Sequence, residues 1–291
     1  LNSHWITELG TFGFGWESRL EEIHSSNIGE HQRDNHGVYG ELASGLGDKL
    51  HGTIGFYANY NTDFGWQVYP GLDLAYRLTS RWRVSTSIGA GQRIPSFTDL
   101  YLDQRPGNVG NPSLQPENAW SYEASIQYEK RKLHLQAGYF SRTITDFSDW
   151  VREDASMPYS PVNLRKNRIQ GLYGRIQQEF DLESLGTVGF RVSYNYLQPS
   201  LETSGTVQSK YVLESLKHQL VTGVHYQVDQ FSVHLKHRWL QRELANAYAV
   251  ADIRLNYHWQ QLLFYTTATN LFNAIYMEAG AVPMPGRWLS I

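Results

Sequence analysis

The chain has 291 residues and a net charge of −3, and it contains 19 Tyr, 9 Trp, 25 Gly and no Cys. The near-neutral charge argues against nucleic acid as a partner, and the absence of cysteine excludes a disulfide framework. No stretch approaches the ~18 apolar residues that a membrane-spanning helix needs, so a helical membrane protein is excluded. The aromatic-rich composition favours strands over helices.

Alternation of apolar and polar residues is the dominant pattern along the chain. From Trp66 to Leu78 the even positions are mostly apolar and the odd positions mostly polar. A period of two predicts β-strands with one apolar and one polar face. The pattern is clearest at 50–60, 66–78, 120–129, 188–196 and 231–239.

Short and long connections alternate between these segments. Short polar turns are predicted at 45–49, 78–81, 129–132, 181–186, 227–230 and 258–261. Longer linkers are predicted at 25–34, 95–116, 146–168, 199–213 and 273–286, with shorter ones at 61–65 and 242–246. Strands joined in this way form an antiparallel up-and-down meander of about fourteen to fifteen strands, with two ends of different character.

The meander has features of an outer-membrane β-barrel. Strands of about ten residues can cross a bilayer when tilted, and such barrels have tight turns at one end and longer loops at the other. Tryptophans near predicted strand ends fit an interfacial girdle. A soluble sandwich or propeller also alternates, and it stays open as an alternative. The tryptophans concerned are Trp66, Trp82, Trp120, Trp239 and Trp259.

Two stretches resemble the signatures of a known family. RIPSFTDLY at 93–101, followed by GNPSLQPENAWSYE at 110–123, closely resembles the FRAPSFxDLY…GNPxLxPExxxxYE signature of TonB-dependent outer-membrane receptors. NLFNAIYMEAGAVPMPGRWLSI at 270–291 resembles the NLFDxxY…PxPGR ending of the same family. One departure is Ile94, where the family usually has alanine. We expect no functional consequence from it.

The resemblance implies an all-β fold. Its form is an antiparallel up-and-down transmembrane β-barrel of about 22 strands around an N-terminal plug with a short energy-coupling box. With fewer strands and no plug in this sequence, we expect residues 1–291 to be the C-terminal portion of such a barrel domain. The implied location is the bacterial outer membrane. The implied partners are outer-membrane lipid, the missing plug and barrel strands, TonB through the plug, and a small-molecule ligand.

The resemblance also implies a receptor, not an enzyme, that takes up a scarce ligand by means of the TonB system and needs no cofactor. The implied ligand is a ferric siderophore or cobalamin, and the motif spacing leans toward the cobalamin branch. A passive or structural, porin-like barrel without energy coupling is the alternative. The sequence has no G-x-S-x-G elbow, HExxH motif or phosphate loop. An outer-membrane lipase or protease would need a nucleophile with a nearby base, which the sequence does not reveal.

Most motif residues are expected to be structural. Prolines close the strand and stiffen the loop, and Gly107 and Gly110 permit positive φ. Arg93, Asn111 and Glu117 are expected to cross-link the loop base through charge-assisted hydrogen bonds. The structural motif residues are Arg93, Pro95, Asp99, Tyr101, Asn111, Pro112, Pro116, Glu117, Glu123, Asn270, Leu271, Tyr276, Pro285, Gly286 and Arg287.

Ligand contact is expected in the predicted 146–168 loop, because its aromatic and basic side chains suit a large ligand. The candidates are Trp150, Arg152, Tyr159 and Arg165. Polar residues at the alternate strand positions that face away from lipid are interpreted first as contacts with the plug and cross-links within the barrel. Lining of a transport path is the second interpretation. These residues are Arg77, Arg83, Glu123, Gln127, Arg191, Asn195 and Arg254.

No metal site is predicted. His24, His31 and His36 share one predicted loop with acidic residues, but their spacing matches no closed site, so we expect solvated loop residues. No histidine lies between His51 and His134, and a haem receptor of this family would be expected to have one between its two loop motifs. Haem uptake is therefore disfavoured.

Overall fold

The structure is a computed structural model, and it describes residues 2–202, 208–209, 216–243, 245–278 and 282–291. Within these ranges the chain is built from β-strands, apart from a short helix α1 (Phe97–Tyr101) and a 3₁₀ turn (Glu183–Leu185). Neither helix is long and apolar enough to cross a membrane. The chain divides into two compact units.

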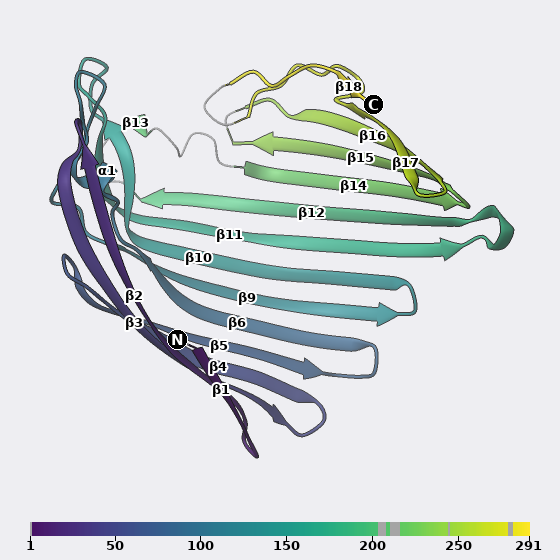
Figure 1. Cartoon of the computed structure of the whole chain (residues 1–291), viewed down its shortest axis with the longest axis horizontal. Coiled ribbons are helices and arrows are strands. Elements are labelled where there is room, and N and C mark those ends of the chain that lie inside the picture. The colour runs from purple at the N-terminus through teal and green to yellow at the C-terminus, as the bar shows by residue number, and fades with distance from the viewer. Residues whose placement is uncertain (1, 203–207, 210–215, 244, 279–281) are drawn as a thin grey trace. The chain divides into compact units, whose positions relative to one another are not determined.

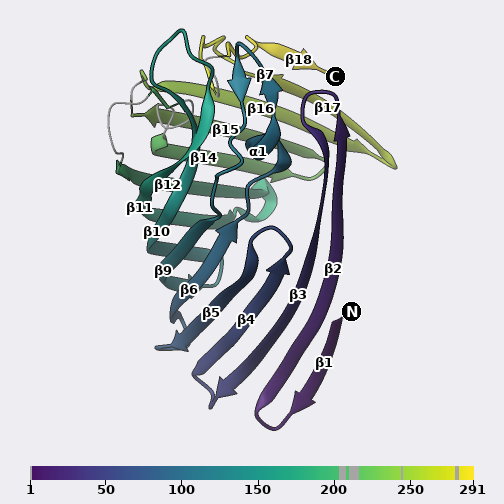
Figure 2. The same cartoon turned by 90° about the vertical axis from the view of Figure 1, so that its left-hand side faces the viewer.

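Unit 1 comprises Leu1–Ala124, Phe140–Gln170 and Pro199–Val212. Its first six strands pair in chain order as an antiparallel meander, which Figure 1 shows. Figure 2 shows that the turns from β1 to β2 and from β3 to β4 lie at the same end of this meander. The strands are β1 (Asn2–Thr7), β2 (Gly10–Ser25), β3 (Gly29–Leu46), β4 (Leu50–Asn61), β5 (Gly65–Arg77) and β6 (Trp82–Arg93).

Unit 2 comprises Ser125–Tyr139, Gly171–Gln198 and Leu213–Ile291. Its strands also pair as antiparallel neighbours. They include β14 (Leu216–Val228), β15 (Phe231–Arg242), β16 (Tyr248–Trp259), β17 (Leu262–Thr269) and β18 (Trp288–Ser290). Four long strands contribute residues to both units: β9 (Glu117–Lys130), β10 (Leu133–Arg152), β11 (Ser160–Asp181) and β12 (Thr187–Glu202).

The main sheet of the described chain has sixteen strands. Hydrogen-bonded neighbours follow the order β1 to β6, β9 to β12 and β14 to β18, which is fifteen strands, and β13 (Gln208–Ser209) pairs with β10 off this path. A separate two-stranded sheet joins β7 (Asp103–Gln104) to β8 (Asn108–Val109). The predicted all-β antiparallel meander of fourteen to fifteen strands is therefore confirmed.

One face of the unit 1 meander is apolar and exposed. Ile54 and Phe56 in β4 are 59% and 51% exposed, and Val68 in β5 is 62% exposed. A soluble sheet would bury a face of this kind, whereas lipid contact requires it to be uncovered. These exposures argue against the soluble sandwich. Trp66 and Trp82, both exposed, lie at the ends of β5 and β6, as an interfacial girdle would place them.

Two predicted linkers are wrong because the strands continue through them. The linker predicted at 25–34 shrinks to 26–28, and the one predicted at 146–168 shrinks to 153–159. A strand that extends beyond a bilayer meets water on both faces, so its alternation fades while its backbone ladder continues. The linker predicted at 199–213 begins as the end of β12 and includes β13, and its other residues lie outside the described ranges.

The buried apolar side chains of unit 1 gather on the 94–116 segment and on the nearby ends of β9, β10 and β11. They are Phe97, Leu100, Leu102, Leu114, Ala119, Ile144, Val151 and Leu164. Backbone hydrogen bonds also join this segment to the connection between β10 and β11, from Val109 N–H to Tyr159 O (2.9 Å) and from Tyr159 N–H to Gly107 O (2.9 Å). The segment that joins β6 to β9 is therefore packed against the strand ends.

Candidate functional site

Helix α1 begins with a reciprocal cap. The backbone N–H of Asp99 donates to Ser96 Oγ (3.1 Å), and Asp99 Oδ2 accepts from the backbone N–H (3.1 Å) and hydroxyl (2.8 Å) of Ser96. This capping box satisfies N–H groups that the first turn would otherwise leave unpaired. The sequence prediction of a plain loop missed α1. The signal that could have found it is Ser96 followed three residues later by an acidic residue.

Arg93, the last residue of β6, joins two buried carboxylates. Its Nη2 lies 2.9 Å from Asp99 Oδ2 and its Nη1 lies 2.6 Å from Glu117 Oε1. Asp99 and Glu117 are each 7% exposed, whereas the Arg93 side chain is 52% exposed. The guanidinium therefore neutralises two carboxylates that are removed from water, and it ties the start of α1 to the start of β9.

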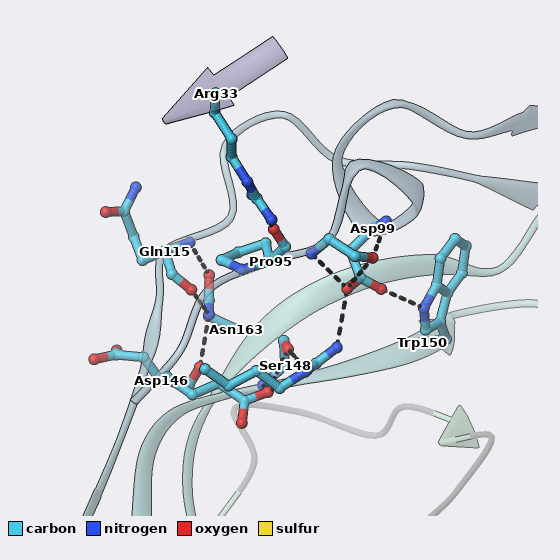
Figure 3. A network of polar contacts seen from close by, with 11 residues as sticks. Arg33, Pro95, Asp99, Gln115, Asp146, Ser148, Trp150 and Asn163 are labelled. Atoms are coloured by element: carbon cyan, nitrogen blue, oxygen red, sulfur yellow. Dashed lines mark hydrogen bonds and ion pairs between the residues drawn. The ribbon is translucent and has the colours of Figure 1, made fainter. Parts of the chain in front are cut away.

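Strand β10 supplies further donors to the same two carboxylates, and Figure 3 shows one of them, the indole of Trp150, directed at Asp99. Glu117 Oε1 accepts from the backbone N–H (3.1 Å) and the hydroxyl (2.5 Å) of Ser148. Asp99 Oδ1 accepts from the indole Nε1–H of Trp150 at 3.1 Å. The residues Arg93, Ser96, Asp99, Glu117, Ser148 and Trp150 are called the loop-base network below. Because several donors bind its two carboxylates, the network fixes the geometry of the loop base.

Arg33 in β3 anchors the other side of the segment. Its Nη1 donates to Pro95 O (2.7 Å), its Nε donates to Glu21 Oε2 (2.6 Å), and its guanidinium lies 4.6 Å from the centre of the Phe97 ring. Arg33 is 8% exposed. Sequence reasoning missed this residue because no local pattern connects it to Pro95, 62 positions away.

A second group of contacts ties the end of the 94–116 segment to β10 and β11. Asn163 Nδ2 donates to Gln115 O (2.9 Å) and to Asp146 O (2.6 Å), and its Oδ1 accepts from Gln115 N–H (2.8 Å). Figure 3 shows Asn163 between these two residues. Asn111 Nδ2 donates to Pro161 O at 3.0 Å. Of the three residues predicted to cross-link the loop base, Arg93 and Glu117 meet, and Asn111 bonds to β11 instead.

Comparison with known proteins identifies the family. Residues 6–274 match the family model described as TonB dependent receptor-like, beta-barrel. This chain belongs to that family. The match covers the meander of unit 1 from the end of β1 onward, the loop-base network and unit 2 up to residue 274.

Relatives of this receptor barrel include two curated vitamin B12 transporters named BtuB. The one from Photobacterium profundum is 31% identical over 206 residues, which are 67% of this chain and 32% of the relative. The one from Vibrio vulnificus is 24% identical over 200 residues, which are 66% of this chain and 30% of the relative. The aligned part of this chain therefore covers about a third of the length of these relatives.

Solved structures share the fold of this receptor barrel. The ferric enterobactin receptor PfeA of Pseudomonas aeruginosa superposes with a TM-score of 0.78 at 18% identity, over 99% of this chain and 52% of that one. The siderophore receptor PirA of Acinetobacter baumannii superposes with a TM-score of 0.76 at 15% identity, over 98% of this chain and 52% of that one. At these identities the similarity shows the fold alone.

The four residues predicted to contact ligand do not share a loop. Trp150 and Arg152 end β10, Tyr159 lies in the 153–159 connection, and Arg165 is an exposed residue of β11. The structure brings Arg152 and Tyr159 together, with the guanidinium carbon 4.6 Å from the ring centre. Trp150 belongs to the loop-base network, and no contact joins Arg165 to the other three in the described part of the receptor barrel.

The C-terminal motif builds a compact turn after β17. Asn270, 3% exposed, donates from Nδ2 to Ala274 O (2.9 Å) and Pro285 O (3.2 Å), and its Oδ1 accepts from Ala274 N–H (2.8 Å). Tyr276 is buried and stacks on Tyr248 at 4.8 Å. Leu271 donates its N–H to Ala251 O at 2.7 Å.

Gly286 and Arg287 meet this turn through Asn273. Asn273 Oδ1 accepts from Arg287 N–H at 2.8 Å, and a Cβ on Gly286 would lie 2.6 Å from the same oxygen. The PGR ending therefore has a packing role in the structure, because glycine lets the backbone approach Asn273.

The remaining motif residues lie at separate places in unit 1. Tyr101 stacks on His31 with ring centres 3.7 Å apart, and Pro95 is fully buried. Pro112 is exposed and Pro116 is partly buried. Glu123 lines a cavity of about 580 Å³ on the polar face, together with residues such as His51 and Asp73.

The histidines predicted to share a loop lie on two strands. His24 is in β2, and His31 and His36 are in β3, because the connection between these strands is only 26–28. No group of three or more His, Asp or Glu side chains suited to a metal ion occurs within the described residues.

The pKa of His24 is expected to exceed its ordinary value of 6.5. The carboxylate of Glu22, 2.7 Å from Nε2, and then that of Glu30, 3.5 Å from Nδ1, raise it by favouring the charged imidazolium. Any stability from these pairs is therefore fully present below pH 6.5 and is lost as the pH rises through the raised pKa. His24 is fully exposed, so the effect is local.

An NMR titration of the His24 Cε1–H signal measures this pKa. We expect a midpoint above 6.5 in the wild type and a return toward 6.5 in the double variant Glu22→Gln, Glu30→Gln. Glu8→Gln, in the turn at the opposite end of β2, serves as the matched control and should leave the midpoint unchanged. A wild-type midpoint at or below 6.5 would contradict the pairing.

Proposed function

We propose that this chain is part of the barrel of an outer-membrane receptor that takes up a scarce ligand by means of the TonB system. The observation that carries the proposal is the match of residues 6–274 to the receptor barrel family. The exposed apolar face of the long strands supports contact with outer-membrane lipid. Further partners in this proposal are a plug domain, the remaining barrel strands and TonB acting through the plug.

The ligand class favoured by the proposal is cobalamin. Support comes from the 31% identity to a relative named as a vitamin B12 transporter. A ferric siderophore is the second candidate, because the structural neighbours are named as siderophore receptors, though at 15–18% identity. Transport in this proposal requires no catalytic residue and no resident cofactor.

Within this function, the loop-base network is proposed as a scaffold. It holds the 94–116 segment against the ends of β9 and β10 through buried charged groups. Arg152 and Tyr159 are proposed as ligand contacts, with Arg165 as a further one. A cation packed on an aromatic ring offers both charge and a flat apolar surface to a large ligand.

The function is tested with the complete polypeptide in its native outer membrane. Cells that carry or lack the gene are incubated with labelled cobalamin or labelled ferric enterobactin, first on ice and then at growth temperature. We expect saturable cobalamin binding on ice, followed by uptake on warming that an uncoupler of the proton-motive force abolishes. Uptake that persists with the uncoupler indicates a passive pore, and saturable binding of ferric enterobactin alone indicates the siderophore class.

Arg152→Ala is expected to weaken binding of the transported ligand about tenfold, which corresponds to about 1.4 kcal/mol. The reason is the loss of the cation that packs on Tyr159. Binding on ice to outer membranes measures the affinity, and immunoblotting measures the amount of receptor. Arg142→Ala, which removes an exposed arginine of β10 ten residues before Arg152, is the control and should bind as the wild type does. Equal ligand affinity of the wild type, Arg152→Ala and Arg142→Ala would show that Arg152 does not contact the ligand.

A further inference from the structure

A hollow lined by basic side chains lies on the polar face of unit 2. It encloses about 510 Å³ around Gly223 of β14, and Arg191 of β12 and Lys236 of β15 flank it. Gly223 pairs with Arg191 on one side and with Lys236 on the other. The three positions thus form one row across three adjacent strands.

The hollow exists because Gly223 has no side chain. A Cβ at this position would meet nothing closer than Leu235 O at 3.8 Å and Arg191 Cβ at 4.0 Å. Neighbouring strands lie about 4.8 Å apart, so the backbones of Arg191 and Lys236 are roughly 10 Å apart. Side chains as long as those of arginine and lysine can both reach a small group placed between them.

The two flanking cations have few partners in the described part of the chain. The Lys236 side chain makes no hydrogen bond or ion pair there, and the Arg191 side chain makes one hydrogen bond, from Nη2 to Gln177 Oε1 at 3.3 Å. In the next row His225 and His234 stack with ring centres 6.2 Å apart, and both line the hollow. Four groups able to donate hydrogen bonds to an anion therefore surround one space.

Two carboxylates approach the hollow, and each has another partner. Glu179 Oε2 lies 3.9 Å from His225 Nε2, but Glu179 Oε1 is 2.7 Å from Lys132 Nζ. Asp252 pairs with Lys236 in register, but its Oδ1 accepts the backbone N–H of Asn270 at 3.0 Å. Neither carboxylate forms an ion pair with Arg191 or Lys236 within the described residues.

We infer that Arg191, Lys236, His225 and His234 bind a phosphate-type oxyanion in the hollow above Gly223. The guanidinium supplies a planar pair of donors, the ammonium supplies a compact charge, and the imidazoles supply ring N–H donors. This site is distinct from the ligand contacts proposed at Arg152 and Tyr159, and it stands whether or not the transported ligand is cobalamin.

The test is a phosphate titration of the complete polypeptide, purified in detergent, at constant ionic strength in chloride. Inorganic phosphate is the probe, and ³¹P NMR line broadening reports binding. We expect Arg191→Gln and Lys236→Gln each to weaken phosphate binding about tenfold, since each removes a charge-assisted contact. Gly223→Val keeps both charges but places a branched side chain, of a type that strands accept, directly between Arg191 and Lys236, so we expect it to abolish binding.

Lys217→Gln is the matched control. Lys217 is on the same strand as Gly223 and is paired with Glu243 at 3.3 Å, so its loss should leave phosphate affinity unchanged. Wild-type affinity in Arg191→Gln and Lys236→Gln, or in Gly223→Val, overturns the inference. The inference is also overturned if the wild-type protein binds no phosphate and Arg191→Gln and Lys236→Gln lower the thermal stability. That result would mean that the two cations pair with an acidic segment of the protein itself.

Discussion

Replacing Arg93 by alanine is expected to loosen the segment 94–116 from the strand ends. The substitution leaves the carboxylates of Asp99 and Glu117, each 7% exposed, without the guanidinium that lies 2.9 and 2.6 Å from them. Charged hydrogen-bond partners left buried in this way are strongly destabilising. Because Arg93 itself is half exposed, we expect a loss of about 2–3 kcal/mol in the free energy that opposes local opening.

Hydrogen exchange with mass spectrometry measures this opening in the complete receptor. The amides of α1 should exchange about 30- to 150-fold faster in Arg93→Ala than in the wild type, whereas those of β14 should not change. Lysine in Arg93→Lys keeps the positive charge but lacks the planar guanidinium that binds two carboxylates at once. The α1 amides of this variant should therefore exchange at a rate between those of the wild type and of Arg93→Ala. Arg175→Ala, an exposed arginine of β11 in unit 2, is the control. Unchanged exchange in α1 would show that the ion pairs add nothing to its anchoring.

Gly110→Ala is expected to displace α1 from the loop that follows it. A Cβ on Gly110 would lie 2.7 Å from Leu100 C, Tyr101 N and Leu102 N, and all three are backbone atoms. They cannot move aside as the end of a side chain would, and the hydrogen bond from Gly110 N–H to Leu102 O (2.7 Å) holds the two segments together. We expect a cost of about 1–3 kcal/mol.

The matched control for this substitution is Gly107→Ala in the same loop, where the nearest atom to a new Cβ is Gln104 O at 3.4 Å. Limited proteolysis of the folded receptor compares the two variants. Cleavage within 94–116 should be faster in Gly110→Ala and unchanged in Gly107→Ala. Equal cleavage of both variants would mean that the close approach at Gly110 does not restrain the segment.

Gly110 also corrects a sequence-based expectation. The sequence suggested that Gly107 and Gly110 are present because they permit positive φ, but neither is among the glycines that adopt it. Gly110 is required by the proximity of the α1 backbone instead. Backbone proximity is a tertiary property, so no local rule for turns could have distinguished the two reasons.

Sequence reasoning predicted most of the strands. The alternation at 66–78 predicted β5 almost to the residue, and the short turn at 227–230 correctly separated β14 from β15. Sequence reasoning placed the strand ends beside the longer connections poorly. Trp150 and Arg152, for example, belong to β10 and not to a loop. Alternation reports which face meets lipid, and this information is lost where both faces of a strand meet water.

The candidate site was only partly visible in the sequence. The resemblance selected Arg93, Asp99 and Glu117, but it did not pair Asp99 with Trp150 or reveal Arg33. These contacts join positions 51 and 62 residues apart. They depend on which strand ends lie beside α1, and that is set by the register of the whole meander.

The amino-acid sequence was sufficient to predict that this protein is built from strands, to predict which alternate residues form the apolar face, and to reveal the motifs of the family. These are local properties, because a period of two and a short motif are complete within one segment. Three contacts became visible only in the folded chain: Arg93 binds Asp99 as well as Glu117, Arg33 donates to Pro95 O, and Arg191 and Lys236 flank an open glycine. Each of these contacts arises when ladder hydrogen bonds fix strands in register, which brings together side chains that are distant in the chain.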